Sequence, residues 1–171
     1  MIRNSLIAHL VLLCTGFAHP QEKPQTIKKT LNVYGVEYAN ACTPHARKAL
    51  RKSVWRVEGG RDASGAWRLV ETLLCAPDSK ASRRYLTSVV PAKVRSVSGA
   101  TGQDEVSEWV KRDGTLIEAL LAEGEAWQAT VKSESTKVSL SYYPSEACIH
   151  TRTLSFVNRR WRLLRISDAC D

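Results

Sequence analysis

The sequence of 171 residues predicts an α+β fold, in which helices in the first two thirds of the chain pack on a carboxy-terminal antiparallel β-meander. Between residues 43 and 123, apolar residues recur at the spacing of an amphipathic helix. From Trp127 onward, apolar and polar residues alternate instead, which is the pattern of a half-buried strand. Cysteines in both regions indicate that disulfides brace this arrangement.

The first 18 residues have the pattern of a secretory signal peptide. Arg3 supplies the positive charge, the run from Leu6 to Ala18 is mostly apolar, and Gly16 and Ala18 are small residues at the positions that a signal peptidase recognises. We therefore expect cleavage after Ala18 and a periplasmic or secreted protein. The apolar run is shorter than the roughly 20 residues of a transmembrane helix, so no transmembrane segment is expected.

Two other interpretations of this segment stay open. It could be an ordinary buried amino-terminal helix, or the signal of a lipoprotein anchored through Cys14. Leu13 stands before that cysteine, where lipoprotein signals use a small residue. After the signal, residues 19–29 are rich in Pro, Gln and Lys and predict a flexible lead-in. Residues 30–171 are expected to form a single domain.

The composition is basic, with a formal net charge of +8 for the whole chain. Loss of Arg3 with the signal would leave 24 basic and 17 acidic residues, or +7. For an exported protein this charge favours acidic partners or anionic polymers of the envelope. Nucleic-acid binding is not expected, because no basic patch is interleaved with stacking aromatics in a known module.

The chain contains five cysteines, and removal of the signal leaves an even number. An even number in an exported chain predicts two disulfides, and four cysteines allow three pairings. We favour pairing Cys42 with Cys75 and Cys148 with Cys170, because each pair then lies within one region of the chain. The sequence has no Cys-x-x-Cys motif, so neither a redox site nor a tetrahedral zinc site is expected.

Helical spacing predicts four helices in the front part of the chain. The first begins at Thr43 and Pro44, because threonine caps a first turn well and proline fits its first position. Pro91 should kink or split the third helix, and Gly124 should end the fourth. The expected helices span residues 43–55, 66–76, 80–97 and 104–123.

Two further segments of the front part are less regular. Residues 31–41 fit a strand or a helix, and Gly35 weakens both. Residues 59–65 form a glycine-rich loop that lacks the Gly-x-x-x-x-Gly-Lys-Ser/Thr pattern of a phosphate cradle. A plain loop, able to protrude toward a partner, is therefore expected there.

The carboxy-terminal region predicts strands at residues 127–135, 137–143, 148–157 and 161–167, with Pro144 ending the second. Residues 158–160 would form a three-residue hairpin connection. If Val157 faces Trp161, paired residue numbers sum to 318. Leu154 then faces Leu164, His150 faces Asp168, and Cys148 faces Cys170, at a separation that a disulfide can bridge.

The candidate catalytic groups are few. His150 with Asp168 could form an oriented base, and Cys42 with His45 could form a nucleophile beside a base. We favour an exposed cross-strand contact for the first pair and a structural disulfide for Cys42. We therefore expect a protein that is not an enzyme, with no catalytic residue, no metal site and no cofactor.

Aromatic and basic residues gather near the final hairpin instead. Arg, Trp and Tyr dominate the energetically important positions of protein interfaces. We therefore predict a partner-binding patch around this hairpin, built from Arg159, Arg160, Trp161, Tyr142 and Tyr143.

The order of elements, together with the strand Trp161-Arg-Leu-Leu-Arg-Ile166, resembles the cone fold of nuclear-transport-factor-2-like proteins. This resemblance covers residues 79–167, and the four cysteines and the helical front half are not part of the family's pattern. Size, export, disulfides and the lack of catalytic groups also look similar to periplasmic immunity proteins, which antagonise toxins such as the cell-wall amidases delivered by type VI secretion.

These resemblances imply two functions. The first is an immunity or inhibitor protein that blocks the cleft of a toxin or cell-wall hydrolase. The alternative is a cone-fold periplasmic protein that holds a small ligand or does modest chemistry between helices and sheet.

Overall fold

The computed structural model describes residues 30–33, 35–57, 62–99, 105–134 and 136–171. The predicted signal peptide (1–18) and lead-in (19–29) lie outside these residues. Among the helices described, none is long and apolar enough to cross a membrane. The elements, in chain order, are β1 (Thr30–Val33), β2 (Val36–Ala39), α1 (Pro44–Val57), α2 (Ala63–Cys75), α3 (Lys80–Val89), β3 (Lys93–Gly99), β4 (Val106–Lys111), α4 (Gly114–Ala119), β5 (Trp127–Glu134), β6 (Lys137–Ser145), β7 (Cys148–Val157) and β8 (Arg160–Cys170).

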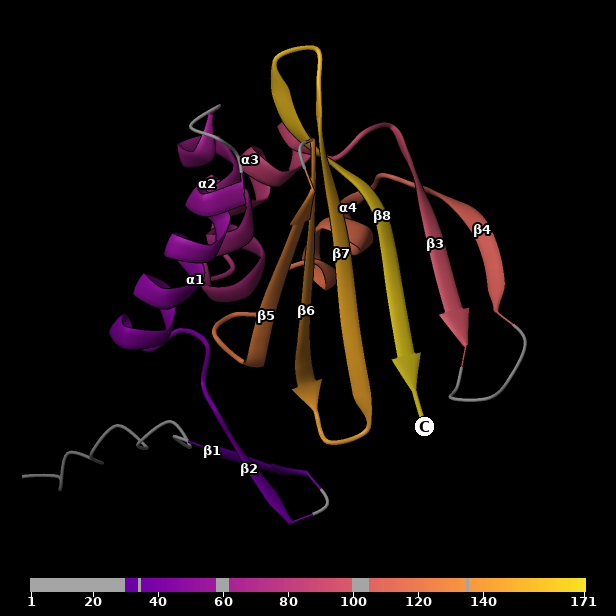
Figure 1. The fold of residues 1–171 in the computed structure, drawn as a ribbon. Coiled ribbons are helices and arrows are strands. Elements are labelled where there is room, and N and C mark those ends of the chain that lie inside the picture. The colour runs from indigo at the N-terminus through magenta and orange to yellow at the C-terminus, as the bar shows by residue number, and fades with distance from the viewer. Residues whose placement is uncertain (1–29, 34, 58–61, 100–104, 135) are drawn as a thin grey trace, which may run out of the picture.

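The predicted α+β class is confirmed. Six strands form one sheet in the order β4-β3-β8-β7-β6-β5, and β1 and β2 form a separate hairpin (Figure 1). β5 to β8 are the expected antiparallel meander, but β3 pairs in parallel with β8, and β4 extends the sheet beyond β3. The sheet is therefore mixed, which the expectation of a simple carboxy-terminal meander missed.

The helices α1, α2 and α3 gather on one side of the sheet (Figure 1). The alternation predicted for β6 decides which strand residues face them: Val138, Leu140 and Tyr142 are buried, and Lys137 is exposed. Leu69, Val70, Leu73 and Leu74 of α2 are fully buried in the same core. This shared apolar core, removed from water, holds helices and sheet together.

Local signals place α1 and α2. The amide of Ala46 donates to Thr43 Oγ1 at 3.3 Å, so Thr43 and Pro44 open α1 as predicted. α2 begins earlier than expected, because the side chain of Asp62 accepts a hydrogen bond from the amide of Gly65. The last part of the predicted loop 59–65 is therefore the first turn of this helix, and its first part lies outside the described residues.

The helix predicted for residues 80–97 is correct only as far as Val89. Val90, which precedes Pro91, is extended with φ −82° and ψ 125°, as expected for a residue before proline. The chain then continues as β3, in which Val94 and Val97 are buried. Their spacing of three residues also suits a helix, but β-branched residues pack well in a strand, and β3 pairs on both of its edges.

The helix predicted for residues 104–123 is wrong over its first half. Val106 to Lys111 form β4, at the edge of the sheet, where Val106 and Trp109 are 62% and 68% exposed. The side chain of Asp113 then accepts from the amide of Leu116 at 2.9 Å and begins the short helix α4. Gly114 is thus the first residue of this helix.

At the amino-terminal side, the strand alternative for residues 31–41 is correct. β1 and β2 pair antiparallel, and Gly35 between them has φ +81°, a conformation that residues other than glycine adopt at a cost. The amide of Gly35 donates to Asn32 Oδ1 at 3.0 Å. This hairpin extends below the helices in Figure 1.

The final hairpin is tighter at its tip than predicted. Asn158 and Arg159 form a two-residue turn with φ values of 52° and 60°, and Val157 pairs with Arg160. Such left-handed turn residues match the twist of the flanking strands. Leu154 therefore faces Leu163 and not Leu164, and β6 continues through Pro144 to Ser145.

A register shift in β8 restores the predicted pairing farther from the tip. The register changes between Thr153 and Leu154, and beyond it His150 pairs with Asp168 and Cys148 with Cys170, as predicted. The extra residue of the bulge, Leu164, is 45% exposed. One bulge thus compensates for the difference of one residue in the turn.

Candidate partner-binding site

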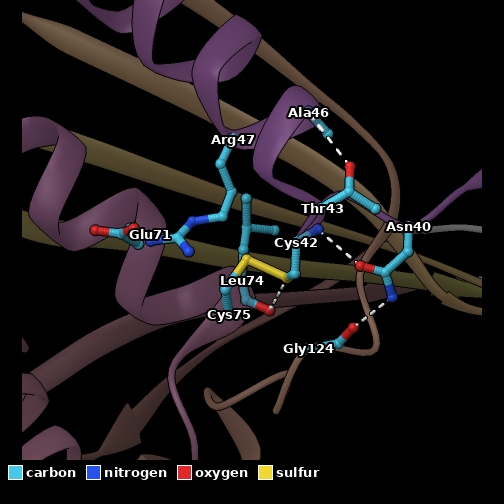
Figure 2. Close-up of a disulfide and its surroundings, with 9 residues drawn as sticks. All are labelled: Asn40, Cys42, Thr43, Ala46, Arg47, Glu71, Leu74, Cys75 and Gly124. Atoms are coloured by element: carbon cyan, nitrogen blue, oxygen red, sulfur yellow. Dashed lines mark hydrogen bonds and ion pairs between the residues drawn. A yellow bond between two sulfur atoms is a disulfide. The ribbon is translucent and has the colours of Figure 1, made fainter. Parts of the chain in front are cut away.

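Both predicted disulfides are present. Cys42, just before α1, is joined to Cys75 at the end of α2, with a Cα–Cα distance of 5.5 Å (Figure 2). Cys148 and Cys170 are joined across the far end of the β7–β8 hairpin, with a Cα–Cα distance of 4.1 Å. Because Cys42 is bonded to Cys75, it is not available as a nucleophile beside His45.

The buried side chain of Asn40 connects the first disulfide to a distant loop. Its Oδ1 accepts from the amide of Cys42 at 2.7 Å, and its Nδ2 donates to the carbonyl of Gly124 at 2.7 Å (Figure 2). The same loop is attached to α2, because the amide of Gly124 donates to the carbonyl of Leu74 at 3.2 Å. These hydrogen bonds hold the backbone near the first disulfide against α2 and the loop that contains Gly124.

A buried polar cluster lies beside the second disulfide. Arg152 on β7 is 2% exposed, and its Nη1 donates to Asp168 Oδ1 at 2.5 Å and to the carbonyl of Ser167 at 3.2 Å. His150 Nε2 is 3.6 Å from the same carboxylate oxygen. The guanidinium carbon of Arg152 is 5.9 Å from the ring centroid of Tyr142.

The surroundings of this cluster shift the pKa values of His150 and Tyr142. Burial, together with the positive charge of Arg152, lowers the pKa of His150, while Asp168 opposes that shift. Burial likewise raises the pKa of Tyr142. The carboxylate of Asp168 contacts Arg152 more closely than His150. Its Oδ1 is 3.6 Å from His150 Nε2, which is too long for a hydrogen bond that would orient the ring.

The tip of the β7–β8 hairpin is the most prominent of the predicted site segments. It rises beyond the rest of the sheet in Figure 1. Asn158, Arg159 and Arg160 are exposed, and the apolar side chain of Val157 is 42% exposed beside them. Neither arginine forms an ion pair with a carboxylate of the described residues.

The aromatic residues of the predicted patch lie elsewhere. Trp161 and Tyr142 are 3% and 2% exposed, since both point into the core, so neither is available to a partner in this fold. Tyr143 is half-buried and stacks on Tyr38 of β2, with ring centroids 5.1 Å apart. The patch therefore divides into an exposed tip, two core residues and a distant tyrosine pair.

Two contacts in this region were not predicted from the sequence: Tyr38 with Tyr143, and Arg152 with Asp168. Tyr38 belongs to a segment for which strand and helix were both open, so nothing indicated that it would reach Tyr143. The contact between Arg152 and Asp168 had a usable signal, because the predicted register places Asp168 two residues beyond the partner of Arg152. A long arginine side chain can bridge that diagonal.

Comparisons with known proteins add little to this description. No protein-family model matches the chain, and no curated protein matches it significantly. Among solved structures, the chain is similar to an NTF-2 like protein of unknown function from Silicibacter pomeroyi. The two are 16% identical, the match covers 63% of this chain and 94% of that one, and the TM-score is 0.41. A likeness of this size supports no inference about function, and none of the comparisons points to an immunity protein.

Proposed function

We propose that the protein is a non-enzymatic, exported binding protein that inhibits a toxin or cell-wall hydrolase by inserting the tip of its β7–β8 hairpin into the cleft of that enzyme. The observation that carries this proposal is the exposed tip, where Arg159 and Arg160 flank the turn beside the apolar Val157. The partner's cleft would carry acidic groups around an apolar floor.

The geometry of the hairpin favours this mode of binding. A two-residue turn in the left-handed conformation leaves little freedom at the tip, and the strands behind it are paired along their length. A binding segment that is already ordered loses little conformational entropy when it docks. The second disulfide ties the two strands together at their other end.

The charge of the tip supports an acidic partner. Arginine binds carboxylates with two parallel hydrogen bonds, and such charged groups accelerate the encounter with a surface of opposite sign. The carboxylates of Asp78, Asp168, Glu71, Glu105 and Glu118 pair with basic groups other than those of the tip. The two tip arginines are thus free of such pairs within the described part of the chain.

The test is affinity capture from the cell extract and secreted fraction of the producing organism, using the oxidised protein. We expect a stoichiometric complex with a hydrolase, and loss of that enzyme's activity when the complex forms. The variant R159E/R160E should lose the complex and the inhibition together. The control K93E/K111E changes the net charge equally on another surface and should retain both.

Either of two results would refute the proposal. One is an unchanged affinity of R159E/R160E for the captured enzyme, which would exclude the tip. The other is a complex in which the enzyme keeps its full activity, which would exclude inhibition. Circular dichroism of both variants establishes that each remains folded.

A second candidate function, a small-ligand carrier, is favoured by one observation. Arg152 Nε is buried without a hydrogen-bond partner among the described atoms, and a buried unpaired donor is unusual in a folded protein. An anionic ligand between helices and sheet would satisfy it. Native mass spectrometry of the purified protein tests this, since a retained small anion would support it and a mass equal to that of the polypeptide would exclude it.

A further inference from the structure

The exposed surface of α1 is strongly basic. The helix contains six basic residues, counting histidine, in its 14 positions and no acidic residue. Lys48, Arg51 and Lys52 are exposed and form no ion pair with the carboxylates that the structure describes. Arg47 differs from them, because it pairs with Glu71 of α2.

Packing explains why these charges share one surface. Leu50 and Val54 of α1 are 9% and 0% exposed and belong to the core, so the opposite side of the helix faces solvent. Residues three, four and seven positions apart lie on one face of a helix. Lys48, Arg51, Lys52 and Trp55 have this spacing and span about 10 Å along the helix axis. We call these four residues the α1 basic face.

An aromatic ring lies at one end of the α1 basic face. Trp55 is 42% exposed, and the guanidinium carbon of Arg51 is 5.0 Å from the centroid of its ring. All four residues of the face line a shallow cavity of about 290 Å³. A second cavity of about 280 Å³ adjoins it between α1 and α2 and shares Lys48 and Arg51. The two together form an open, continuous basic surface.

We propose that the α1 basic face binds a polyanionic polysaccharide. The three cations would contact its carboxylate, sulfate or phosphate groups, and the C–H face of a sugar ring would pack on the indole of Trp55, whose ring face is electron-rich. An open surface suits an extended chain better than an enclosed small molecule. This proposal does not depend on the hairpin tip or its partner.

Three other occupants fit the same face less well. The core of a protein interface is depleted of lysine, and this face has two lysines around a single aromatic residue. Insertion into a lipid bilayer requires a wide apolar face, and the apolar face of α1 is used in the core. A nucleic acid would offer both charge and stacking, but the two disulfides indicate an oxidising compartment, where polysaccharides are the more usual polyanions.

The test uses heparin, a sulfated and carboxylated polysaccharide, and measures its dissociation constant by calorimetry at low and at higher salt. We expect binding that weakens as salt screens the charges. The variant K48E/K52E should weaken binding about tenfold or more, because two cations that would contact the anionic groups become anions that repel them. W55A should weaken it about threefold, which separates stacking from charge.

The matched control is K93E/K111E, which changes the net charge equally but lies on β3 and β4, and it should bind heparin as the unaltered protein does. If K48E/K52E fails to fold, K48Q/K52Q removes the two charges without reversing them. The tip variant R159E/R160E should also keep its heparin affinity, so that this proposal and the inhibitor proposal can fail separately.

Three results would overturn the proposal. One is an absence of heparin binding, and another is an equal loss of affinity in K48E/K52E and K93E/K111E, which would show only a response to net charge. The third is tighter binding of single-stranded DNA or of vesicles containing anionic phospholipid than of heparin. Each would assign the α1 basic face to something other than a polysaccharide.

Discussion

The two ends of the β7–β8 hairpin contrast sharply. One end carries the Cys148–Cys170 disulfide, and the nearby carboxylate of Asp168 is shared by Arg152 and His150. The other end is a turn of two left-handed residues with two exposed arginines. One end of this pair of strands is therefore joined by a disulfide beside a buried charge cluster, and the other end is an exposed turn whose arginines are unpaired among the described residues.

This difference separates stability from binding. Buried groups near the disulfide have partners inside the protein, so altering them should change the free energy of unfolding. Exposed groups at the tip have no such partners in the described chain, so altering them should change only what the protein binds. The predictions below test this separation, starting with the largest expected effect on stability.

Removal of the second disulfide, in C148S/C170S, should destabilise the protein by about 3 kcal/mol, because the bridge closes a long loop and so restricts the unfolded chain. Urea denaturation of the oxidised variant and the unaltered protein measures the change. The variant should still inhibit the enzyme captured through the tip. A change within experimental error would mean that this end of the hairpin needs no covalent link.

Substitution of Asp168 by Asn should destabilise the protein by about 2 kcal/mol, because the buried guanidinium of Arg152 then lacks its counter-charge. The effect is moderated by the 36% exposure of the Asp168 side chain. The double variant R152M/D168N, which removes the buried charge as well, should recover part of this loss. Urea denaturation of R152M, D168N, R152M/D168N and the unaltered protein gives a double-mutant cycle. If the losses of unfolding free energy in the two single variants simply add up in the double variant, the pairing of Arg152 with Asp168 is contradicted.

The pH dependence of stability should reveal the neutral state of His150. Its pKa is lowered in the folded protein, so the folded state favours the uncharged ring. The resulting stabilisation is complete above the ordinary pKa of 6.5 and is lost as the pH falls from there toward the lowered value. Thermal unfolding of the unaltered protein should show this decline, and H150Q should lack this part of it. An identical pH profile for both would refute this assignment.

Reversal of the tip charges, in R159E/R160E, should change the free energy of unfolding by no more than about 0.5 kcal/mol, because both side chains are exposed. The same urea denaturation measures it. A loss comparable to that of C148S/C170S would show that the tip contributes to the fold, and would remove the distinction between the two ends.

Much of the carboxy-terminal sheet could be predicted because its signals are local. The alternation in β6 identified Val138, Leu140 and Tyr142 as one face, and all three are buried. The two cysteine pairs were favoured because each lies within one region of the chain, and strand register supported Cys148 with Cys170. Both disulfides are present. The start of α1 likewise depended only on Thr43 and Pro44, which lie next to the turn that they open.

The middle of the chain could not be predicted in the same way. Residues 93–97 and 106–111 have apolar spacings that suit a helix, yet they form β3 and β4. Their strand conformation depends on β8, which pairs with β3 from more than 60 positions away, for example Arg95 with Arg165. Local periodicity contains no information about such a distant partner.

The candidate site, too, combines features set by local sequence with features set by distant contacts. The sequence by itself determined that the final strands form a hairpin with arginines near its tip, because alternation and turn residues act over a few neighbouring positions. Only the tertiary structure decided that Trp161 and Tyr142 are buried, that Arg152 meets Asp168, and that the cations of α1 share an open face. Those outcomes depend on how helices and sheet pack together, and packing is set by contacts between residues that are distant in the chain.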